Sequence, residues 1–501
     1  MKRHGSGRKL QTNISPIHTA ITCASTVGET ALFARSAADR AKSAVHLPRL
    51  HTGVADIDAA FRIALGDLAG NIQPYQGALA ARAEPCLLAG LDYDSPWTRD
   101  AAFNTWYAGA ALAPEAARAT LRAVLTRDAH GLRIGGEYWD AVVWVAGAWA
   151  LWTQTAERDD LQLAFEVARN SLRFFEATER DPRDGLFRGG ACFQDGVAGY
   201  PDAFADSTTS GIADYITKHP EARAPIGFGL PMKALSTNCL YAEAYRLLAL
   251  IAQRIGEPEA EWQAKADALG AAIRAQFWNP ATGTFRYLLD AGDDPARQEG
   301  FGHAFALWFG IATPEQTRSV LARQHHTPHG IPCVWPAYAR YTSPDGTTFG
   351  RHCGTIWPQV NAAWAAATTV CGRPDLAWQE LRLLAAKAAR DSQFAEIYHP
   401  VDGRIYGGLQ EMPQNGKGII EWTACRRQTW CATGFLHMVT HTLIGLRPTP
   451  DGLRIEPWLP PELPRVELTG WPWRGTPLDF IVERTPNGYR VNGKPPAACT
   501  L

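Results

Sequence analysis

The sequence predicts an all-α fold in which helices form a closed ring of six helical hairpins, followed by a small β appendage. Apolar residues recur at helical spacing through residues 56–443, with Gly/Pro loops between the helical stretches. Stretches that are apolar nearly all round alternate with amphipathic ones, which predicts an inner and an outer layer of helices. A Pro-x-x-Gly turn recurs at 182–185, 280–283 and 400–403, and repeated turn chemistry indicates a repeated supersecondary unit.

The expected helices differ in how much of their surface is apolar. Residues 139–152 and 360–370 are apolar on almost every side, as expected of helices buried on both faces. Residues 260–277 are amphipathic and are expected in the outer layer. The full set of expected helices is 56–69, 114–125, 139–152, 160–177, 235–255, 260–277, 302–310, 314–323, 360–371, 376–390 and 428–443.

The pattern changes after Leu446. Short β-type runs at 452–455, 465–468, 478–482 and 489–491 are separated by Pro and Gly, as expected of strands joined by turns. We therefore expect three parts: an N-terminal extension over 1–55 with one helix at 30–44, a helical domain over 56–443, and a small β appendage over 444–501.

Composition excludes several classes of partner. The 501 residues carry 49 basic and 50 acidic side chains, a net charge of −1, so charge gives no reason to expect nucleic acid or an acidic membrane. No apolar run approaches the ~20 residues that span a bilayer. No secretory signal is recognised, and the ten scattered cysteines form no Cys-x-x-Cys pair, so we expect a cytoplasmic protein. The oligomeric state is not indicated.

The sequence predicts neither a metal nor a cofactor. His325, His326 and His329 lack a carboxylate at helical spacing, and Pro328 to Gly330 has the composition of a loop. No dinucleotide-binding, kinase or Gly-x-Ser-x-Gly pattern is present.

Tryptophan points instead to a sugar. The chain has 18 tryptophans. Most large aromatic residues belong to a core, but several of these stand beside carboxylates and arginines. Aromatic faces next to such groups match the alternating apolar and hydroxyl surface of a carbohydrate. We therefore expect an oligosaccharide or small glycoside as substrate.

One segment differs from its counterparts. The third Pro-x-x-Gly turn is preceded by Glu396-Ile397-Tyr398-His399, whereas the other two turns have no such run. It lies at the end of a helical stretch, where functional side chains are commonly presented. A repeated scaffold with one chemically distinct copy indicates a site at Glu396.

Polar and aromatic residues also gather where other helices begin. The segments are 92–100, 136–140, 189–202, 352–361 and 421–430, and in a helical ring these ends converge. Asp100 could instead cap a helix, and Asp195 or Asp202 could form an Asx turn. The candidate substrate-binding residues are Trp97, Arg99, Asp100, Tyr138, Trp139, Asp140, Trp357, Gln359, Asn361, Tyr398, Arg426, Gln428 and Trp430.

These motifs resemble those of the inverting six-hairpin α-glycosidases, a family with an (α/α)6 toroid that includes processing α-glucosidase I and bacterial mannosylglycerate hydrolases. Residues 396–403 resemble the family's Glu-x-Tyr-x-Pro-x-x-Gly segment, and residues 354–361 resemble its Gly-Pro-Ile-Trp-x-x-x-Asn segment. Trp97 to Asp100 is similar to the Trp-x-x-Asp that opens the toroid. The resemblance covers most of 56–443.

The resemblance implies two catalytic residues. Glu396 matches the family's general base. The general acid of the family lies in a Gly-x-Asp-Asn-x-Pro stretch, and the corresponding loop here, 194–201, has its proline further from the acid. Asp195 is the first choice for this role and Asp202 the second. We expect Asp195 to be protonated in a partly apolar pocket. The β appendage resembles that of related toroid phosphorylases and rhamnosidases.

The implied activity is hydrolysis of an α-glucoside or α-mannoside with inversion, for which the two carboxyl groups should lie roughly 6.5–9.5 Å apart. Three alternatives remain: a toroid glycoside phosphorylase, a non-catalytic glycan-binding toroid, and a sugar epimerase or isomerase using His303, His352 or His399. The sequence does not specify the sugar, the linkage or the leaving group.

Overall fold

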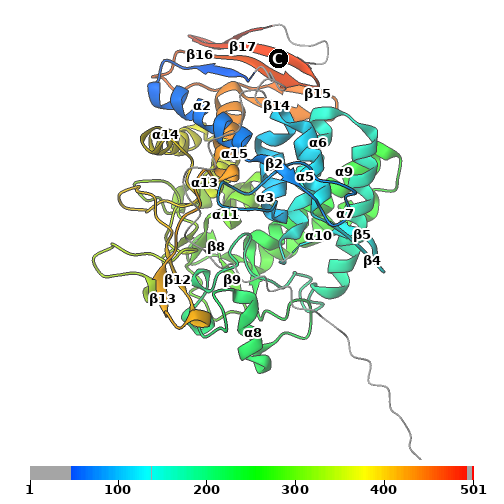
Figure 1. Ribbon diagram of the computed structural model, residues 1–501, viewed down its shortest axis with the longest axis vertical. Coiled ribbons are helices and arrows are strands. Elements are labelled where there is room, and N and C mark those ends of the chain that lie inside the picture. The colour runs from blue at the N-terminus through cyan, green and yellow to red at the C-terminus, as the bar shows by residue number, and fades with distance from the viewer. Residues whose placement is uncertain (1–46, 137, 494–498, 501) are drawn as a thin grey trace, which may run out of the picture. The chain divides into compact units, whose positions relative to one another are not determined.

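The computed structural model describes residues 47–500 except 137 and 494–498. The chain divides into two units, Met1–His46 and Leu47–Leu501. The first unit, with the helix expected at 30–44, lies outside the described residues. The second unit consists of helices with short strands between them and a group of longer strands near the C-terminal end of the chain (Figure 1).

Six helices contact one another in a cycle. In chain order each contacts the next, and the last contacts the first. These inner helices are α3 (Thr98–Asn104), α6 (Trp144–Thr155), α9 (Leu235–Ile255), α11 (Gly300–Trp308), α13 (Pro358–Val370) and α15 (Thr429–Met438).

Six further helices alternate with these along the chain. They are α2 (Ala55–Gly70), α5 (Pro114–Ala123), α7 (Arg158–Thr178), α10 (Ala260–Gln276), α12 (Pro314–Arg323) and α14 (Pro374–Asp391). The loop that follows each of them leads to the start of an inner helix. All the helices expected from periodicity are present with shifts at their ends. α3 was not among them, although a helix was expected to follow the 92–100 segment.

Short helical segments complete the helical part. Two of them, η1 (Thr105–Gly109) and η9 (Val439–Ile444), are π-helical and extend α3 and α15. The others are α4 (Ala110–Leu112), η2 (Ala141–Val143), η3 (Val197–Gly199), η4 (Asp202–Ala205), η5 (Ile212–Asp214), α8 (Tyr215–Lys218), η6 (Pro220–Ala222), η7 (Ala339–Tyr341) and η8 (Pro413–Asn415).

Burial follows the expected layering. In α13 every residue from Pro358 to Thr368 is buried. In α10 the buried residues recur at helical spacing, from Trp262 to Ile273, and the remainder face outward. Small residues let the inner helices approach: Gly147 of α6 lies against Ala102 of α3, where a Cβ atom would come within 3.0 Å of a backbone oxygen.

The three Pro-x-x-Gly turns share one geometry, as their sequence predicted. Gly185, Gly283 and Gly403 have φ of 77°, 67° and 71°, a conformation that glycine adopts without strain. The amide of each glycine donates to the carbonyl four residues earlier, at 2.8, 2.8 and 3.0 Å.

Strands near the C-terminal end form two sheets. One has the order β1-β16-β17-β18 and the other β14-β15-β19. All four runs expected after Leu446 are strands. The pairing of β1 with β16 was not expected, since it adds residues from before the helices to this sheet. The strands are β1 (Arg49–His51), β14 (Leu446–Thr449), β15 (Gly452–Ile455), β16 (Arg465–Trp473), β17 (Thr476–Thr485), β18 (Gly488–Asn492) and β19 (Cys499–Thr500).

Two-stranded ribbons lie in the loops between helices. They are β2 (Ile72–Tyr75) with β3 (Glu84–Leu87), β4 (Leu125–Asp128) with β5 (Gly131–Ile134), β6 (Lys233–Ala234) with β9 (Leu288–Leu289), β7 (Trp278–Asn279) with β8 (Thr284–Phe285), β10 (Gln298–Glu299) with β11 (Val334–Trp335), and β12 (Leu409–Glu411) with β13 (Ile419–Glu421).

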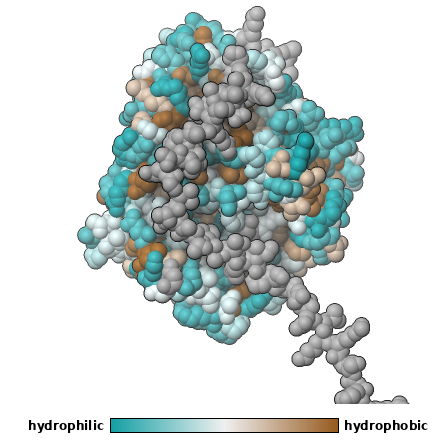
Figure 2. Space-filling view, viewed as in Figure 1, coloured by the Kyte–Doolittle hydropathy of each residue, from teal (hydrophilic) through white to brown (hydrophobic). Residues whose placement is uncertain are grey.

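The surface in Figure 2 is mostly hydrophilic where it is coloured, with hydrophobic residues scattered over it. Within the part of the chain that the structure describes, none of the helices has the length and apolar character to cross a bilayer.

Candidate active site

Glu396 is held in a fixed position between α14 and α15. Its backbone amide donates to the carbonyl of Cys425 at 3.0 Å, and its side chain is 3% exposed. Its Oε1 accepts a hydrogen bond from the Tyr93 hydroxyl at 3.0 Å. Its Oε2 accepts from Nη2 of Arg351 at 2.9 Å and from the backbone amide of Cys425 at 3.0 Å. Three donors from different parts of the chain thus orient this carboxylate.

Asp195 lies in the loop between α7 and α9. The Asp195 carbonyl accepts a hydrogen bond from the amide of Ile212 at 2.8 Å, which joins this part of the loop to a later part. Its carboxylate lies 3.0 Å from Nη2 of Arg99 and 3.6 Å from Nε2 of His352. The side chain is 33% exposed, in contrast to that of Glu396.

The carboxylates of Glu396 and Asp195 contact two residues that are adjacent in the chain. Arg351 binds Glu396, and its chain neighbour His352 contacts Asp195. Adjacent Cα atoms are about 3.8 Å apart, so these contacts bring Asp195 and Glu396 to one site. The ring of Trp357 stacks on His352 with centroids 5.2 Å apart, and the Arg351 guanidinium lies 5.1 Å from the centre of the same ring.

The charged groups around Asp195 favour its ionised form, whereas the sequence analysis expected a protonated side chain. Burial raises the pKa of its carboxyl, but the charge and hydrogen bond of Arg99, together with smaller contributions from His352 and Arg351, hold the pKa below its usual range. The expectation of a protonated Asp195 is therefore wrong for the protein without substrate. The sequence placed Arg99 among the sugar-binding groups and did not indicate that it would pair with this acid.

The imidazole of His352 is neutral across the ordinary pH range. Burial lowers its pKa to about 3, although the charge of Asp195 acts in the opposite direction. Since the imidazole carries no charge near neutral pH, the positive charge that acts on Asp195 comes from Arg99, which contacts it directly, and from Arg351.

Arg99 also connects Asp195 to a second acid. Its Nη1 lies 3.7 Å from Oδ2 of Asp140, and that oxygen accepts a hydrogen bond from the amide of Phe193 at 2.8 Å. The guanidinium lies 4.8 Å from the centre of the Tyr138 ring. Arg99, Tyr138 and Asp140 were all predicted site residues, and the structure brings them together beside Asp195.

Other predicted residues form polar pairs with side chains distant in sequence. Nε2 of Gln428 donates to Oδ1 of Asp100 at 3.2 Å, and both side chains are buried. Arg426 forms an exposed ion pair with Asp92 at 2.7 Å, next to the segment that carries Tyr93. Asp202, the second choice for the acid, is exposed at the start of η4.

Three predicted binding residues make contacts that build the scaffold. Trp139 is fully buried beneath Gly189 and Gly190, and its indole donates to the carbonyl of Ala191 at 3.0 Å. The amide of Asn361 donates to Glu380 of α14 at 2.9 Å. The hydroxyl of Tyr398 accepts from the amide of Ala395 at 3.0 Å, which shapes the turn behind Glu396. Their roles in binding substrate stay predictions.

Five predicted residues have buried polar atoms without a hydrogen-bond partner. Buried polar atoms are nearly always paired in proteins, so such atoms suggest a ligand-binding surface. Among the described side chains, the buried atoms without a hydrogen-bond partner include Nε1 of Trp97, Nε and Nη1 of Arg99, both amide atoms of Gln359, Oε1 of Gln428 and Nε1 of Trp430.

Sequence reasoning missed Tyr93 and Arg351, and considered His352 solely as a proton shuttle. Tyr93 stands between Asp92 and Asp94 in a segment that was already singled out, and Arg351 precedes the Gly354–Asn361 motif. The one sequence feature that could have identified Tyr93 and Arg351 as site residues is their position beside these motifs. No group of three or more His, Cys, Asp or Glu in residues 47–500, the undescribed positions apart, is arranged to hold a metal ion.

Comparison with known proteins identifies the class. A model of the mannosylglycerate hydrolase MGH1-like glycoside hydrolase domain matches residues 93–430, more than half of the chain. The match spans the residues that bind the carboxylates of Asp195 and Glu396, which are Tyr93, Arg99, Arg351, His352 and Cys425. The chain therefore belongs to this family of glycoside hydrolases, and its resemblance to the six-hairpin glycosidases is confirmed.

Solved structures agree in fold. The chain is 17% identical to a GH63 mannosylglycerate hydrolase from Thermus thermophilus, with a TM-score of 0.56 over 75% of this chain and 99% of that one. It is 16% identical to a sialidase, with a TM-score of 0.63 over 89% of this chain and 40% of that one. A GH78 rhamnosidase of a Bacillus species is 14% identical, with a TM-score of 0.58 over 90% of this chain and 42% of that one.

The chain thus spans about two fifths of the sialidase and rhamnosidase chains. Comparison with curated protein sequences gave no match.

Proposed function

We propose that this protein hydrolyses an α-glycosidic bond with inversion, with Glu396 as general base and Asp195 as general acid. The observation that carries the proposal is the convergence of both carboxylates on Arg351 and His352. Glycoside hydrolysis typically requires two carboxyl groups that flank the glycosidic bond. Membership of the MGH1-like family supports the reaction class.

In this mechanism Asp195 donates its proton to the glycosidic oxygen as the bond from that oxygen to the anomeric carbon breaks. Glu396 takes a proton from a water molecule, whose oxygen attacks the anomeric carbon from the opposite face. A carboxylate offers about four lone-pair positions, and Glu396 uses three of them for Tyr93, Arg351 and Cys425. The remaining position on Oε1 would accept the hydrogen bond of the water.

Asp195 must gain a proton before it can act. About a third of its side chain is exposed, and a bound sugar would cover that surface. Removing water from a carboxylate disfavours its charged form and raises its pKa. Substrate binding would thereby convert an ionised Asp195 into a proton donor.

We also propose that the twelve alternating helices form an (α/α)6 toroid. The cycle of contacts among α3, α6, α9, α11, α13 and α15 supports this arrangement. The loops leading to their N-terminal ends supply Tyr93, Asp195, Arg351 and Glu396, so the site would lie at one end of the ring.

The substrate that we propose is an α-glucoside or α-mannoside, with glucose favoured. The Thermus thermophilus enzyme of similar fold is a mannosylglycerate hydrolase that was solved in complex with glucose, so both sugars are kept as candidates. A screen of α-linked glucose and mannose disaccharides with the wild-type protein tests the proposal. Release of free monosaccharide without added phosphate is expected. Cleavage that depends on phosphate would assign a phosphorylase, and no cleavage of any α-glycoside would overturn the proposal.

The epimerase alternative receives no support from His303 or His352, two of the three histidines considered for it. His352 has a pKa lowered to about 3 by burial. The ring nitrogens of buried His303 contact Gln324 at 2.6 Å and the carbonyl of Phe285 at 3.0 Å. A proton shuttle near neutral pH needs an accessible imidazole that titrates there, and these two histidines do not provide one.

Removing the charge of Arg99 is expected to move the alkaline limb of the kcat/KM profile to higher pH. Arg99 holds the pKa of Asp195 below its usual range, and kcat/KM reports the pKa values of the free enzyme. Arg99→Gln should raise this pKa, so that Asp195 stays protonated to higher pH. Measuring kcat/KM across the acidic and neutral pH range checks this.

Arg99→Lys serves as the matched control because it keeps the positive charge, and its alkaline limb should stay near that of the wild type. If Arg99→Gln leaves the limb in place, Asp195 is not the titrating acid.

A further inference from the structure

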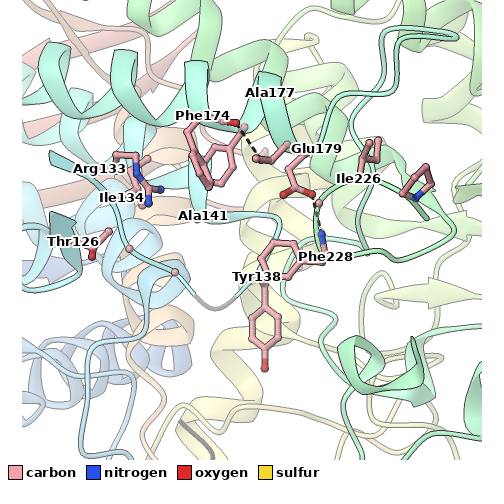
Figure 3. Close-up of a pocket in the computed structure, with 16 residues that line it drawn as sticks. Thr126, Arg133, Ile134, Tyr138, Ala141, Phe174, Ala177, Glu179, Ile226 and Phe228 are labelled. Carbon is pink, nitrogen blue, oxygen red and sulfur yellow. Dashed lines mark hydrogen bonds between the residues drawn. The ribbon is translucent and has the colours of Figure 1, made fainter. Parts of the chain in front are cut away.

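A cavity of about 670 Å³ lies between the end of α7 and the loop that carries Tyr138. Figure 3 shows its aromatic side chains, Tyr138, Phe174 and Phe228, around the carboxylate of Glu179. The loop Pro225–Phe228 lines one side, and β4 and β5 contribute Thr126, Arg133 and Ile134. A volume in this range is typical of sites that bind small molecules.

Among the described residues that line this cavity, Glu179 is the acidic one. Its residue follows directly after α7 and is 4% exposed, and its Oε2 accepts a hydrogen bond from the amide of Phe228 at 3.3 Å. Burial raises the pKa of its carboxyl to about 7. Arg133, the cation among the described lining residues, forms an ion pair with Asp128 and lies 3.9 Å from the centre of the Phe174 ring. Glu179 therefore has no ion pair with Arg133 and keeps acceptor positions for a ligand.

Tyr138 joins the cavity to the candidate active site. Its ring is part of the cavity lining and also carries the guanidinium of Arg99, which binds Asp195 at 3.0 Å. Gly135, another lining residue, accepts a hydrogen bond from Thr98, the neighbour of Arg99, at 2.9 Å. In Figure 3 the Tyr138 hydroxyl points away from Glu179 while the Glu179 carboxylate points toward the Tyr138 ring.

The position of Asp195 indicates on which side of the cleaved glycosidic bond the cavity lies. A general acid lies next to the leaving group, because it protonates the oxygen that departs with it. The cavity is connected to Asp195 through Arg99 and Tyr138, whereas Glu396 is bound by Tyr93, Arg351 and Cys425, none of which lines it.

We infer that this cavity binds a sugar unit of the leaving group, beyond the unit attached to the cleaved bond. This inference rests on the proposed function. The aromatic rings would pack on the apolar face of the sugar, and Glu179 would accept hydrogen bonds from its hydroxyl groups. A neutral sugar fits this lining, since a buried carboxylate would repel an acidic one. The substrate class is therefore an oligosaccharide with at least two sugar units after the cleaved bond.

Glu179→Gln is expected to lower kcat/KM for an α-linked trisaccharide by about tenfold, the usual cost of weakening a hydrogen bond to a charged group. The same variant should hydrolyse an aryl α-glycoside at close to the wild-type rate, because an aryl group does not extend past Asp195. Glu166→Gln is the matched control: Glu166 is exposed on the same helix and does not line the cavity. Equal loss on both substrates, or no loss on either, would overturn the inference.

A second variant fills the space and leaves Glu179 in place. Ala177 is exposed at the end of α7 and lines the cavity, so Ala177→Trp should obstruct it. Selective loss of trisaccharide hydrolysis would support the inference, and unchanged preference between the two substrates would contradict it.

A binding measurement distinguishes failure of this inference from failure of the proposed function. Calorimetric titration of the wild-type protein, Ala177→Trp and Glu166→Gln with maltotriose and an α-linked mannotriose needs no turnover. If no α-glycoside is cleaved but Ala177→Trp alone loses binding, the proposed function fails and the cavity assignment stands. If Ala177→Trp binds both trisaccharides like the wild type, the cavity assignment fails.

Discussion

Glu396→Gln is expected to reduce kcat by ~10² or more while the protein still binds sugar, the usual consequence of removing a general base. The amide keeps the shape of the side chain and can accept from Tyr93 through its oxygen. It cannot take a proton from water, and it places an NH₂ group where Arg351 or Cys425 now donates. The loss should be similar for a natural disaccharide and for an α-glycosyl fluoride, because both need an activated water.

Steady-state kinetics with both substrates, together with calorimetric titration of the product sugar, measures this effect. Glu421→Gln is a suitable control, since Glu421 is exposed on β13 and lies a short distance along the chain from Cys425. Near-normal turnover by Glu396→Gln would remove Glu396 from the mechanism.

Asp195→Asn is expected to lower kcat for a natural disaccharide by about 10²–10⁴, the usual range for a lost acid catalyst. The loss should be far smaller for an α-glycosyl fluoride, whose leaving group departs without a proton. This difference between substrates distinguishes an acid from a base, because Glu396→Gln should impair both. The ratio of kcat values on the two substrates is the measurement.

Asp202→Asn tests the second choice for the acid. Asp202 is exposed, whereas Asp195 contacts Arg99 and His352, so Asp202→Asn should behave like the wild type on both substrates. If Asp202→Asn shows the selective loss and Asp195→Asn does not, the acid has been assigned to the wrong residue.

Periodicity predicted the helices because most of them are long enough to repeat their pattern. Residues 235–255 and 260–276 are examples, with ends within a residue of the expectation. The expected helix at 139–152 begins later, with η2 at Ala141. Trp139 and Asp140 instead bond to the loop at Ala191 and Phe193, a tertiary contact that local sequence does not show.

The site was predictable only in part, because local sequence identifies candidate residues but does not show their tertiary contacts. Residue type and position at a helix end identified Asp195, Arg99 and Glu396 as candidates, but did not reveal which way each side chain faces. Trp139 was expected to line the site, and its contact with two glycines distant in sequence could not be predicted from the local sequence. The contact of Arg351 with Glu396 joins residues 45 positions apart, so it becomes visible only in the folded chain.

Proton NMR of the sugar first released from an α-linked disaccharide tests the central claim most directly. If Glu396 activates a water on the face opposite the leaving group, the first-formed product is the β-anomer, which then mutarotates to the equilibrium mixture. Initial appearance of the α-anomer would contradict the account, because it would require a retaining mechanism in place of direct displacement by water.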